Sequence, residues 1–302
     1  VTTNSVVTTV ADSGAGSLRN ILADAEPDYT ITFATALAGQ TIGLTTGSIT
    51  LDRNLTIDGA GNTIQISGNN LSRIFFVNSG VSAMLNRLTL MNGLASQGGA
   101  IQNLGSLTLN QCTFAGNQDN CGCGINGGAI LNRGSLVAND STFSSNTARF
   151  GGAIFNDLSS TLTVNQSTFS GNVGTNGGGA IYNLNGTLTV RQSTVVGNQS
   201  PGGGAQGGGI NNSGFGFFLT NSIVCLNTAS SSPNIAGVVT PFSSPNNLVD
   251  INPLLSSPSN NGGPTQTMPP LAGSPALNAG NDAVTALFAS DQRGAGFPRV
   301  SG

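Results

Sequence analysis

The residues that could carry out chemistry are few and widely separated along this chain. The 302 residues include 12 Asp and Glu, nine Arg, no Lys and no His. Without His, neither a Ser–His nor a Cys–His nucleophile pair can form. Asp52 and Asp58 are the best acidic pair for a polysaccharide lyase or hydrolase, enzymes that need a base or clustered carboxylates. Because the sequence after Asp58 is typical of a turn, we interpret both residues as structural.

The four cysteines are Cys112, Cys121, Cys123 and Cys225. The two thiols of Cys121-Gly122-Cys123, without a His nearby, do not match a zinc site. A disulfide in an oxidising compartment fits better, and the spacing leaves its connectivity open. Cys112 aligns with serines of later repeats, so a small inward-facing side chain is the alternative. The sequence therefore predicts no metal site and no cofactor.

Two charged residues, Arg133 and Asp157, occupy equivalent positions in successive copies of an internal repeat. We expect them to form an ion pair at the surface rather than a catalytic group. Such a pair stabilises a fold by only about 0–1 kcal/mol.

The repeat itself predicts the architecture. Gly-Gly-Ala-Ile occurs four times and a Gly-Gly-Ile variant once, at intervals of 24 to 29 residues. A stretch of alternating apolar residues follows each copy, and then Phe-x-x-Asn or Val-x-x-Asn. Alternation with period two indicates strands, and the turns between them are too short for a crossover helix. Each strand must therefore pair with its equivalent one repeat later, which predicts an all-β parallel coil, a β-solenoid.

The aligned repeats predict continuous columns of side chains along this coil. An inward column of isoleucines contains Ile101, Ile130, Ile154, Ile181 and Ile210, and an inward column of phenylalanines contains Phe114, Phe143 and Phe169. A ladder of asparagines at a turn contains Asn117, Asn146, Asn172, Asn198 and Asn227. Asn suits that place because it tolerates left-handed backbone and its amide can bond to both neighbours in a stack.

Three segments follow from the extent of the repeat. We expect the β-helix to cover residues 41–230. Residues 1–40 predict an N-terminal cap with a strand and a short helix that begins after Ser17. Residues 231–302, where Pro becomes frequent and the repeat ends, predict an irregular C-terminal cap.

The motifs also resemble known families. Gly-Gly-Ala-Ile with Phe-x-x-Asn resembles the repeats of chlamydial polymorphic outer-membrane proteins. Residues 11–19 resemble an N-terminal motif of secreted bacterial β-helix proteins. The motifs at 252–255, 260–265, 273–280 and 291–294 resemble the choice-of-anchor Q domain, which often precedes a surface-sorting signal. These resemblances imply a right-handed parallel β-helix on a bacterial surface or secreted from the cell.

Composition restricts the partners. Only 7% of residues are charged, with a net charge of −3, so no basic patch favours nucleic acid or an anionic membrane surface. No apolar run reaches the length of a membrane span. Since the chain begins at Val1 without Met, we expect an extracellular or cell-surface protein whose leader has been removed.

We therefore favour a structural or adhesive surface scaffold over an enzyme, with surface glycans or another cell surface as partner. Self-assembly head to tail into filaments is one version of this hypothesis. The alternative is a β-helix that binds or cleaves polysaccharide. Ice binding through rows of Thr is a third hypothesis, which the uneven repeat lengths disfavour because they predict no regular face.

Overall fold

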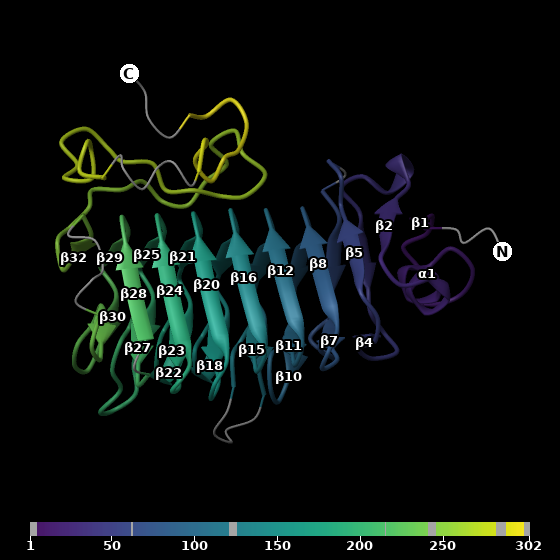
Figure 1. Ribbon diagram of the computed structural model, residues 1–302, viewed down its shortest axis with the longest axis horizontal. Helices are drawn as coiled ribbons and strands as arrows, with labels where there is room; N and C mark the ends of the chain where they lie inside the picture. The colour runs from purple at the N-terminus through teal and green to yellow at the C-terminus, as the bar shows by residue number, and fades with distance from the viewer. Residues whose placement is uncertain are drawn as a thin grey trace.

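The computed structural model shows an elongated coil of short strands with a separate layer along one side (Figure 1). It describes residues 5–61, 63–120, 126–214, 216–240, 246–281 and 288–298. Every pairing between two named strands in these residues is parallel and joins equivalent strands of successive turns. The predicted all-β parallel helix is confirmed.

Four parallel sheets run along the coil. Sheet 1 contains β1 (Val6–Val7), β2 (Tyr29–Phe33), β5 (Leu55–Asp58), β8 (Ser82–Asn86), β12 (Ser106–Asn110), β16 (Ser135–Asn139), β20 (Thr161–Asn165), β24 (Thr187–Arg191) and β28 (Gly216–Thr220). Sheet 2 contains β3 (Thr41–Gly43), β6 (Gln65–Ser67), β9 (Thr89–Met91), β13 (Thr113–Ala115), β17 (Thr142–Ser144), β21 (Thr168–Ser170), β25 (Thr194–Val196), β29 (Ile223–Cys225) and β32 (Leu248–Val249).

The other two sheets complete each turn. Sheet 3 contains β4 (Ile49–Leu51), β7 (Phe75–Val77), β11 (Ile101–Asn103), β15 (Ile130–Asn132), β19 (Ile154–Asn156), β23 (Ile181–Asn183), β27 (Ile210–Asn212) and β31 (Ile235–Ala236). Sheet 4 contains β10 (Leu94–Ala95), β14 (Gln118–Asp119), β18 (Thr147–Phe150), β22 (Val173–Gly177), β26 (Gln199–Ser200) and β30 (Thr228–Ala229). From β8 onward the chain passes through sheets 1, 2, 4 and 3 in that order before it begins the next turn, whereas the strands of the two earlier turns belong to sheets 1, 2 and 3.

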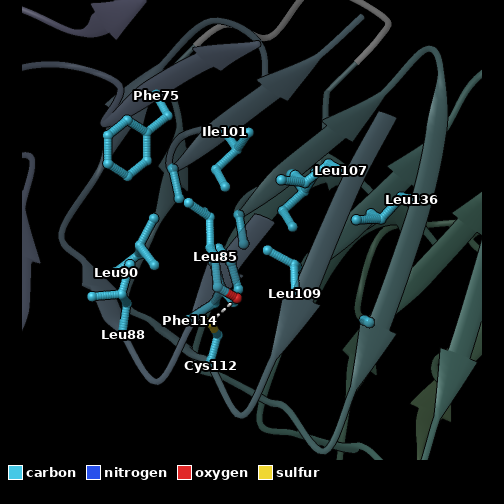
Figure 2. Close-up of a cluster of buried hydrophobic side chains, with 14 of the residues drawn as sticks. Phe75, Leu85, Leu88, Leu90, Ile101, Leu107, Leu109, Cys112, Phe114 and Leu136 are labelled. Atoms are coloured by element: carbon cyan, nitrogen blue, oxygen red, sulfur yellow. Dashed lines mark hydrogen bonds between the residues drawn. The ribbon is translucent and has the colours of Figure 1, made fainter. Parts of the chain in front are cut away.

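Side chains from sheets 1, 2 and 3 meet in one continuous core. Figure 2 shows a section of it, where Leu85 and Leu109 of sheet 1, Phe114 of sheet 2 and Ile101 of sheet 3 point toward the same interior. The isoleucines of the repeat lie directly over one another, since Ile130 pairs with both Ile101 and Ile154. All five isoleucines of that column are fully buried.

The phenylalanines stack in the same way. The ring of Phe143 lies between those of Phe114 and Phe169, with centroids 4.8 and 4.6 Å apart and planes within 5° of parallel. The spacing equals the distance between neighbouring strands of a sheet, about 4.8 Å. Strand pairing therefore fixes the geometry of the aromatic stack.

Close backbone approach explains the two glycines of the repeat. Gly127 has φ of +85°, and a Cβ there would overlap the carbonyl oxygen of Ile130. A Cβ on Gly128 would overlap the carbonyl oxygen of Gly152 in the next turn. Only glycine accommodates both the left-handed backbone and this contact between turns.

The uneven repeat lengths do not disturb the sheets. The pairing in sheet 1 keeps the same register from Leu55 to Thr220. Extra residues are placed between strands, as in the segment 201–206 between β26 and β27. The strands of sheet 1 therefore stay in register although the repeats differ in length, because the loops absorb the difference; a flat face matched to an ice lattice stays disfavoured as a hypothesis.

The N-terminal segment closes one end of the coil (Figure 1). Helix α1 (Leu18–Asp24) begins after Ser17, whose hydroxyl accepts a hydrogen bond from the Asn20 amide, and it buries Leu18, Ile21 and Leu22. A short 3-10 helix, η1 (Thr35–Leu37), follows β2. Strands β1 and β2 already belong to sheet 1, so parallel pairing begins before residue 41. It also continues past residue 230, through β31 and β32.

The C-terminal segment differs from the expected cap because it lies along the side of the coil (Figure 1). It covers the corner where the chain passes from sheet 1 to sheet 2. Thr265 donates to the Asp140 carbonyl over 2.9 Å, and Thr168 donates to Gln292 over 2.7 Å. Hydrogen bonds from the polar groups of this corner therefore hold the segment against the side of the coil and not at its end.

Asp12 holds the N-terminal end together. Its carboxylate accepts hydrogen bonds from the Thr45 and Thr46 amides over 2.9 and 2.7 Å, and from Arg19 over 2.7 Å. Burial raises the pKa of Asp12, but the hydrogen bonds from Thr46, Thr45 and Arg19 outweigh burial and keep this pKa well below its ordinary value. The fold therefore favours the charged carboxylate.

We expect Phe143→Ala to lower the free energy of unfolding by about 3–5 kcal/mol, because it leaves a cavity in the aromatic stack. Urea denaturation followed by circular dichroism measures the change. Ser144→Ala, on the same strand and half-buried, is the control and should change stability by less than about 0.5 kcal/mol. Equal effects of the two substitutions would contradict the stacked core.

We expect Asp12→Asn to lower the free energy of unfolding at pH 7 by about 1.5–3 kcal/mol, the contribution of hydrogen bonds to a charged group. Because folding lowers the pKa of Asp12, its contribution is present above about pH 4 and is lost as the pH falls toward the folded-state value. Denaturation of both proteins between pH 7 and pH 2 measures this, and their stabilities should converge in acid. Asp24→Asn, at the exposed end of α1, should show no such convergence.

Candidate functional surfaces

The acidic residues considered for catalysis lie in separate ion pairs. Asp52 contacts Arg53 over 2.8 Å, and Asp58 contacts Arg87 over 2.6 Å. The hydrogen bond from Arg53 lowers the pKa of Asp52. A general acid needs a raised pKa, so the environment of Asp52 is opposite to that of a catalytic acid. The described residues contain no cluster of three or more His, Cys, Asp or Glu side chains that could hold a metal ion.

Arg133 and Asp157 form the ion pair predicted from their alignment. The Nε atom of Arg133 lies 2.8 Å from a carboxylate oxygen of Asp157. Asp157 is 6% exposed, and its other oxygen accepts a hydrogen bond from the Leu158 amide. The pairing is confirmed, but Asp157 is buried rather than at the surface, and both of its oxygens have structural partners.

Cys112 and Cys225 are buried free thiols, so neither belongs to a disulfide. Cys112 occupies the small inward position after β12, and its Sγ donates to the Leu85 carbonyl over 3.3 Å (Figure 2). Burial raises the pKa of both thiols to about 12, which makes them poor nucleophiles and poor metal ligands. Cys121 and Cys123 lie outside the described residues, so a disulfide that involves them stays a prediction with its connectivity open.

The asparagines that follow the phenylalanine column form a buried hydrogen-bonded ladder. The amide of Asn146 donates to the side chain of Asn172 over 2.9 Å and to the Phe114 carbonyl over 3.0 Å. Its oxygen accepts from both the backbone and the side chain of Asn117. The same pattern joins all five members, Asn117, Asn146, Asn172, Asn198 and Asn227.

The expectation that these asparagines themselves adopt left-handed backbone is wrong. The left-handed residue is the one before each Asn, for example Gly116 with φ of +64° and Ser145 with φ of +54°. Asn is required there for its amide, which satisfies backbone groups that the turn leaves unpaired. The Asn side chain therefore supplies hydrogen bonds to backbone groups that strand pairing leaves unpaired at a corner.

A second buried ladder follows the isoleucine column and was not predicted from the sequence. Its members are Asn103, Asn132, Asn156, Asn183 and Asn212, joined by side-chain hydrogen bonds of 2.7–2.8 Å. Each lies two residues after an isoleucine of the repeat. This constant spacing is a signal in the sequence from which the ladder could be predicted. Both ladders are buried scaffolds and offer no group to a partner.

The outer face of sheet 1 is a regular surface that runs along the coil (Figure 1). One outward row contains Thr30, Thr56, Met84, Thr108, Val137, Thr163, Thr189 and Phe218, which pair in unbroken register. A neighbouring row of asparagines is linked by hydrogen bonds of 2.8–2.9 Å, from Asn110 to Asn86, from Asn139 to Asn110 and from Asn165 to Asn139. The charged residues of these rows are Asp58, at the start of the asparagine row, and Arg191, which Thr220 follows one turn later.

The comparisons with known proteins agree with this architecture. Residues 140–157 and 166–184 match the Chlamydia polymorphic membrane protein repeat. These two segments of the coil are therefore similar to repeats of this type. Each matched segment begins at a left-handed corner residue, Asp140 or Gln166, and includes the strands of sheets 2, 4 and 3. No curated protein matches the chain.

The matched segments omit the strand of sheet 1 that lies between them, β20. The features that define the repeat are therefore those that build the coil: the phenylalanine, both asparagine ladders and the paired glycines. The outer face of sheet 1 is formed by residues outside these two matched segments.

We expect Asn146→Ala to lower the free energy of unfolding by about 2–5 kcal/mol, because the Asn117 amide and the Phe114 carbonyl lose their partner inside the coil. Asn139→Ala, in the half-buried outer row, is the matched control and should cost less than about 1 kcal/mol. Urea denaturation of the two variants measures the difference. A similar loss in both would contradict the role given to the buried ladder.

Proposed function

We propose that this protein is an extracellular scaffold on a bacterial cell surface whose adhesive contact surface is the outer face of sheet 1. The observation that carries the proposal is the unbroken register of that face from Leu55 to Thr220. The polymorphic membrane protein repeat and the solenoid fit a surface-exposed β-helix protein. In the described residues, no helix is long and apolar enough to cross a membrane.

The chemistry of this face suits contact with another uncharged surface. Hydroxyl and amide groups recur at every strand, about 4.8 Å apart, and few charges must be desolvated on contact. Met84 and Phe218 add partly exposed apolar area, at 38% exposure each. Many weak contacts in a fixed array give high avidity together, because each contact after the first is intramolecular.

Two other versions of this function have less support. Filament formation would require contact at the N-terminal end, where α1 lies against the first turn and buries Leu18, Ile21 and Leu22 (Figure 1). Polysaccharide cleavage would require acid–base groups, whereas Asp52 and Asp58 each pair with an arginine. Electron microscopy of the concentrated protein tests the filament version, and monomers alone would exclude it.

We expect a double substitution on the proposed contact face, Val137→Lys with Thr163→Lys, to reduce adhesion by about tenfold or more, because two buried ammonium groups would oppose contact. Beads coated with each protein are tested for retention on a panel of bacterial cells and glycan-coated surfaces. Circular dichroism verifies the fold of each variant.

The control for charge is Leu71→Lys with Leu226→Lys. These side chains are 72% and 52% exposed and lie at turns away from sheet 1. The control protein should adhere like the unaltered one. No adhesion to any surface, or equal loss in both variants, would contradict the proposed contact face.

A further inference from the structure

The outer face of sheet 1 changes its pattern at its last two strands, β24 and β28, which lie at the C-terminal end of the sheet (Figure 1). In the earlier turns, a row of asparagines runs from Asn86 to Asn165 in unbroken register. Arg191 of β24 takes the next position of that row. The face therefore carries a charged side chain where the preceding turns carry an amide.

Arg191 interrupts the hydrogen bonds of the asparagine row. Each amide of the row donates to the side-chain oxygen one turn earlier, as Asn139 does to Asn110 and Asn165 does to Asn139, both over 2.9 Å. The side-chain oxygen of Asn165 is buried and has no partner among the described residues, because Arg191 stands where the next asparagine would donate to it. A buried acceptor without a partner lowers stability. A repeat that departs from its own rule at such a cost indicates a functional position.

The guanidinium of Arg191 forms no compensating contact within the part of the chain that the structure describes. In β24, Leu188 and Val190 point into the core, so that Arg191 lies on the outer face. The other described arginines each contact a carboxylate, a backbone carbonyl or an aromatic ring. The charge and the N–H donors of Arg191 are therefore available to an anion from outside the chain.

The neighbouring strand, β28, departs from the pattern as well. Gly216 follows Thr187 in its row, and the next row continues from Thr189 to Phe218. The ring of Phe218 is 38% exposed, and Gly216 leaves room beside it, since an added Cβ would lie 3.7 Å from its Cε2 atom. Phe218 and Arg191 are two positions apart on adjacent strands, which places their Cα atoms about 8 Å apart at the usual spacings. One or two units of a sugar chain can span this distance.

We propose that this end of the face binds an acidic polysaccharide, with Arg191 binding a carboxylate and the ring of Phe218 packing against the C–H groups of a sugar. A guanidinium matches the oxygens of a carboxylate with parallel N–H donors. A uronic acid combines a carboxylate with an apolar face in one ring, which suits these two side chains. The proposal rests on the outer face of sheet 1 being the contact surface and adds the class of partner.

The surroundings of the two side chains favour a polysaccharide over an acidic peptide. Thr189 and Thr220 lie beside Phe218 and Arg191 on the same face, and the earlier turns add further hydroxyl and amide groups. These groups suit a chain that is rich in hydroxyls and carries spaced carboxylates. An acidic peptide would bring many charges to a face that offers few cations.

Calorimetric titration of the full chain with oligosaccharides of hyaluronate and of alginate tests the proposal. We expect at least one of them to bind, and its methyl ester to bind about tenfold more weakly or not at all, because the ester lacks the charge. Arg191→Gln should weaken binding by about tenfold or more, and Phe218→Thr by about threefold or more. Arg149→Gln removes the same charge from sheet 4 and should bind like the unaltered protein.

Thermal unfolding without ligand separates a binding role of Arg191 from a structural one. Arg191→Asn should raise the midpoint of unfolding, because the new amide can donate to the unpaired oxygen of Asn165, as Asn165 itself does to Asn139. The same variant should lose the binding of acidic oligosaccharides. A lower midpoint would show that Arg191 supports the fold, and the role proposed for it would be wrong.

Four results of the titration would overturn the proposal. No acidic oligosaccharide binds, the methyl ester binds as tightly as the acid, Arg191→Gln binds as tightly as the unaltered protein, or polyglutamate binds and the oligosaccharides do not. The bead assay keeps this proposal distinct from the contact face on which it rests. Adhesion that is lost in Val137→Lys with Thr163→Lys but unchanged in Arg191→Gln would keep the contact face and reject the acidic partner. The reverse result would reject the contact face and keep the saccharide site.

Discussion

The register between successive turns is the constraint on which the rest of the structure depends. Parallel pairing places each residue over its equivalent, so that Ile101, Ile130 and Ile154 form one line and the rings of Phe114, Phe143 and Phe169 form another. A substitution at one of these positions therefore changes the packing of the turns on both sides. The same constraint organises the exterior, where the hydroxyls and amides of sheet 1 acquire a regular spacing that no single turn could provide.

Polar groups at the corners are the main cost of this architecture. Each corner interrupts the hydrogen bonding between strands, and an unpaired backbone group inside the coil would lower the stability of the fold. The two buried asparagine ladders solve this at two corners of the coil, after sheet 2 and after sheet 3, by placing a donor and an acceptor there, as Asn146 does between Asn117 and Asn172.

The C-terminal segment and the outer face of sheet 1 give the molecule two different kinds of surface. Sheet 1 presents a repetitive, nearly uncharged array that suits many weak contacts. The C-terminal segment crosses the neighbouring corner and forms one side of a half-open pocket there, with polar and apolar residues on the same side.

The sequence by itself determined the coil, its inward columns and the buried ladder at Asn117, because these features recur in every repeat and depend only on pairing with an identical neighbour. It also indicated the Arg133–Asp157 pair, for the same reason.

Tertiary structure alone decided the rest. The C-terminal segment has no repeat to fix its position, so its place along the side, rather than on the end, depends on contacts such as that between Thr265 and Asp140, 125 residues apart. The pocket between this corner and the C-terminal segment exists only because that segment returns to the coil. A repeat specifies what lies above and below each residue, whereas contacts between repetitive and non-repetitive parts of a chain arise only when both are folded.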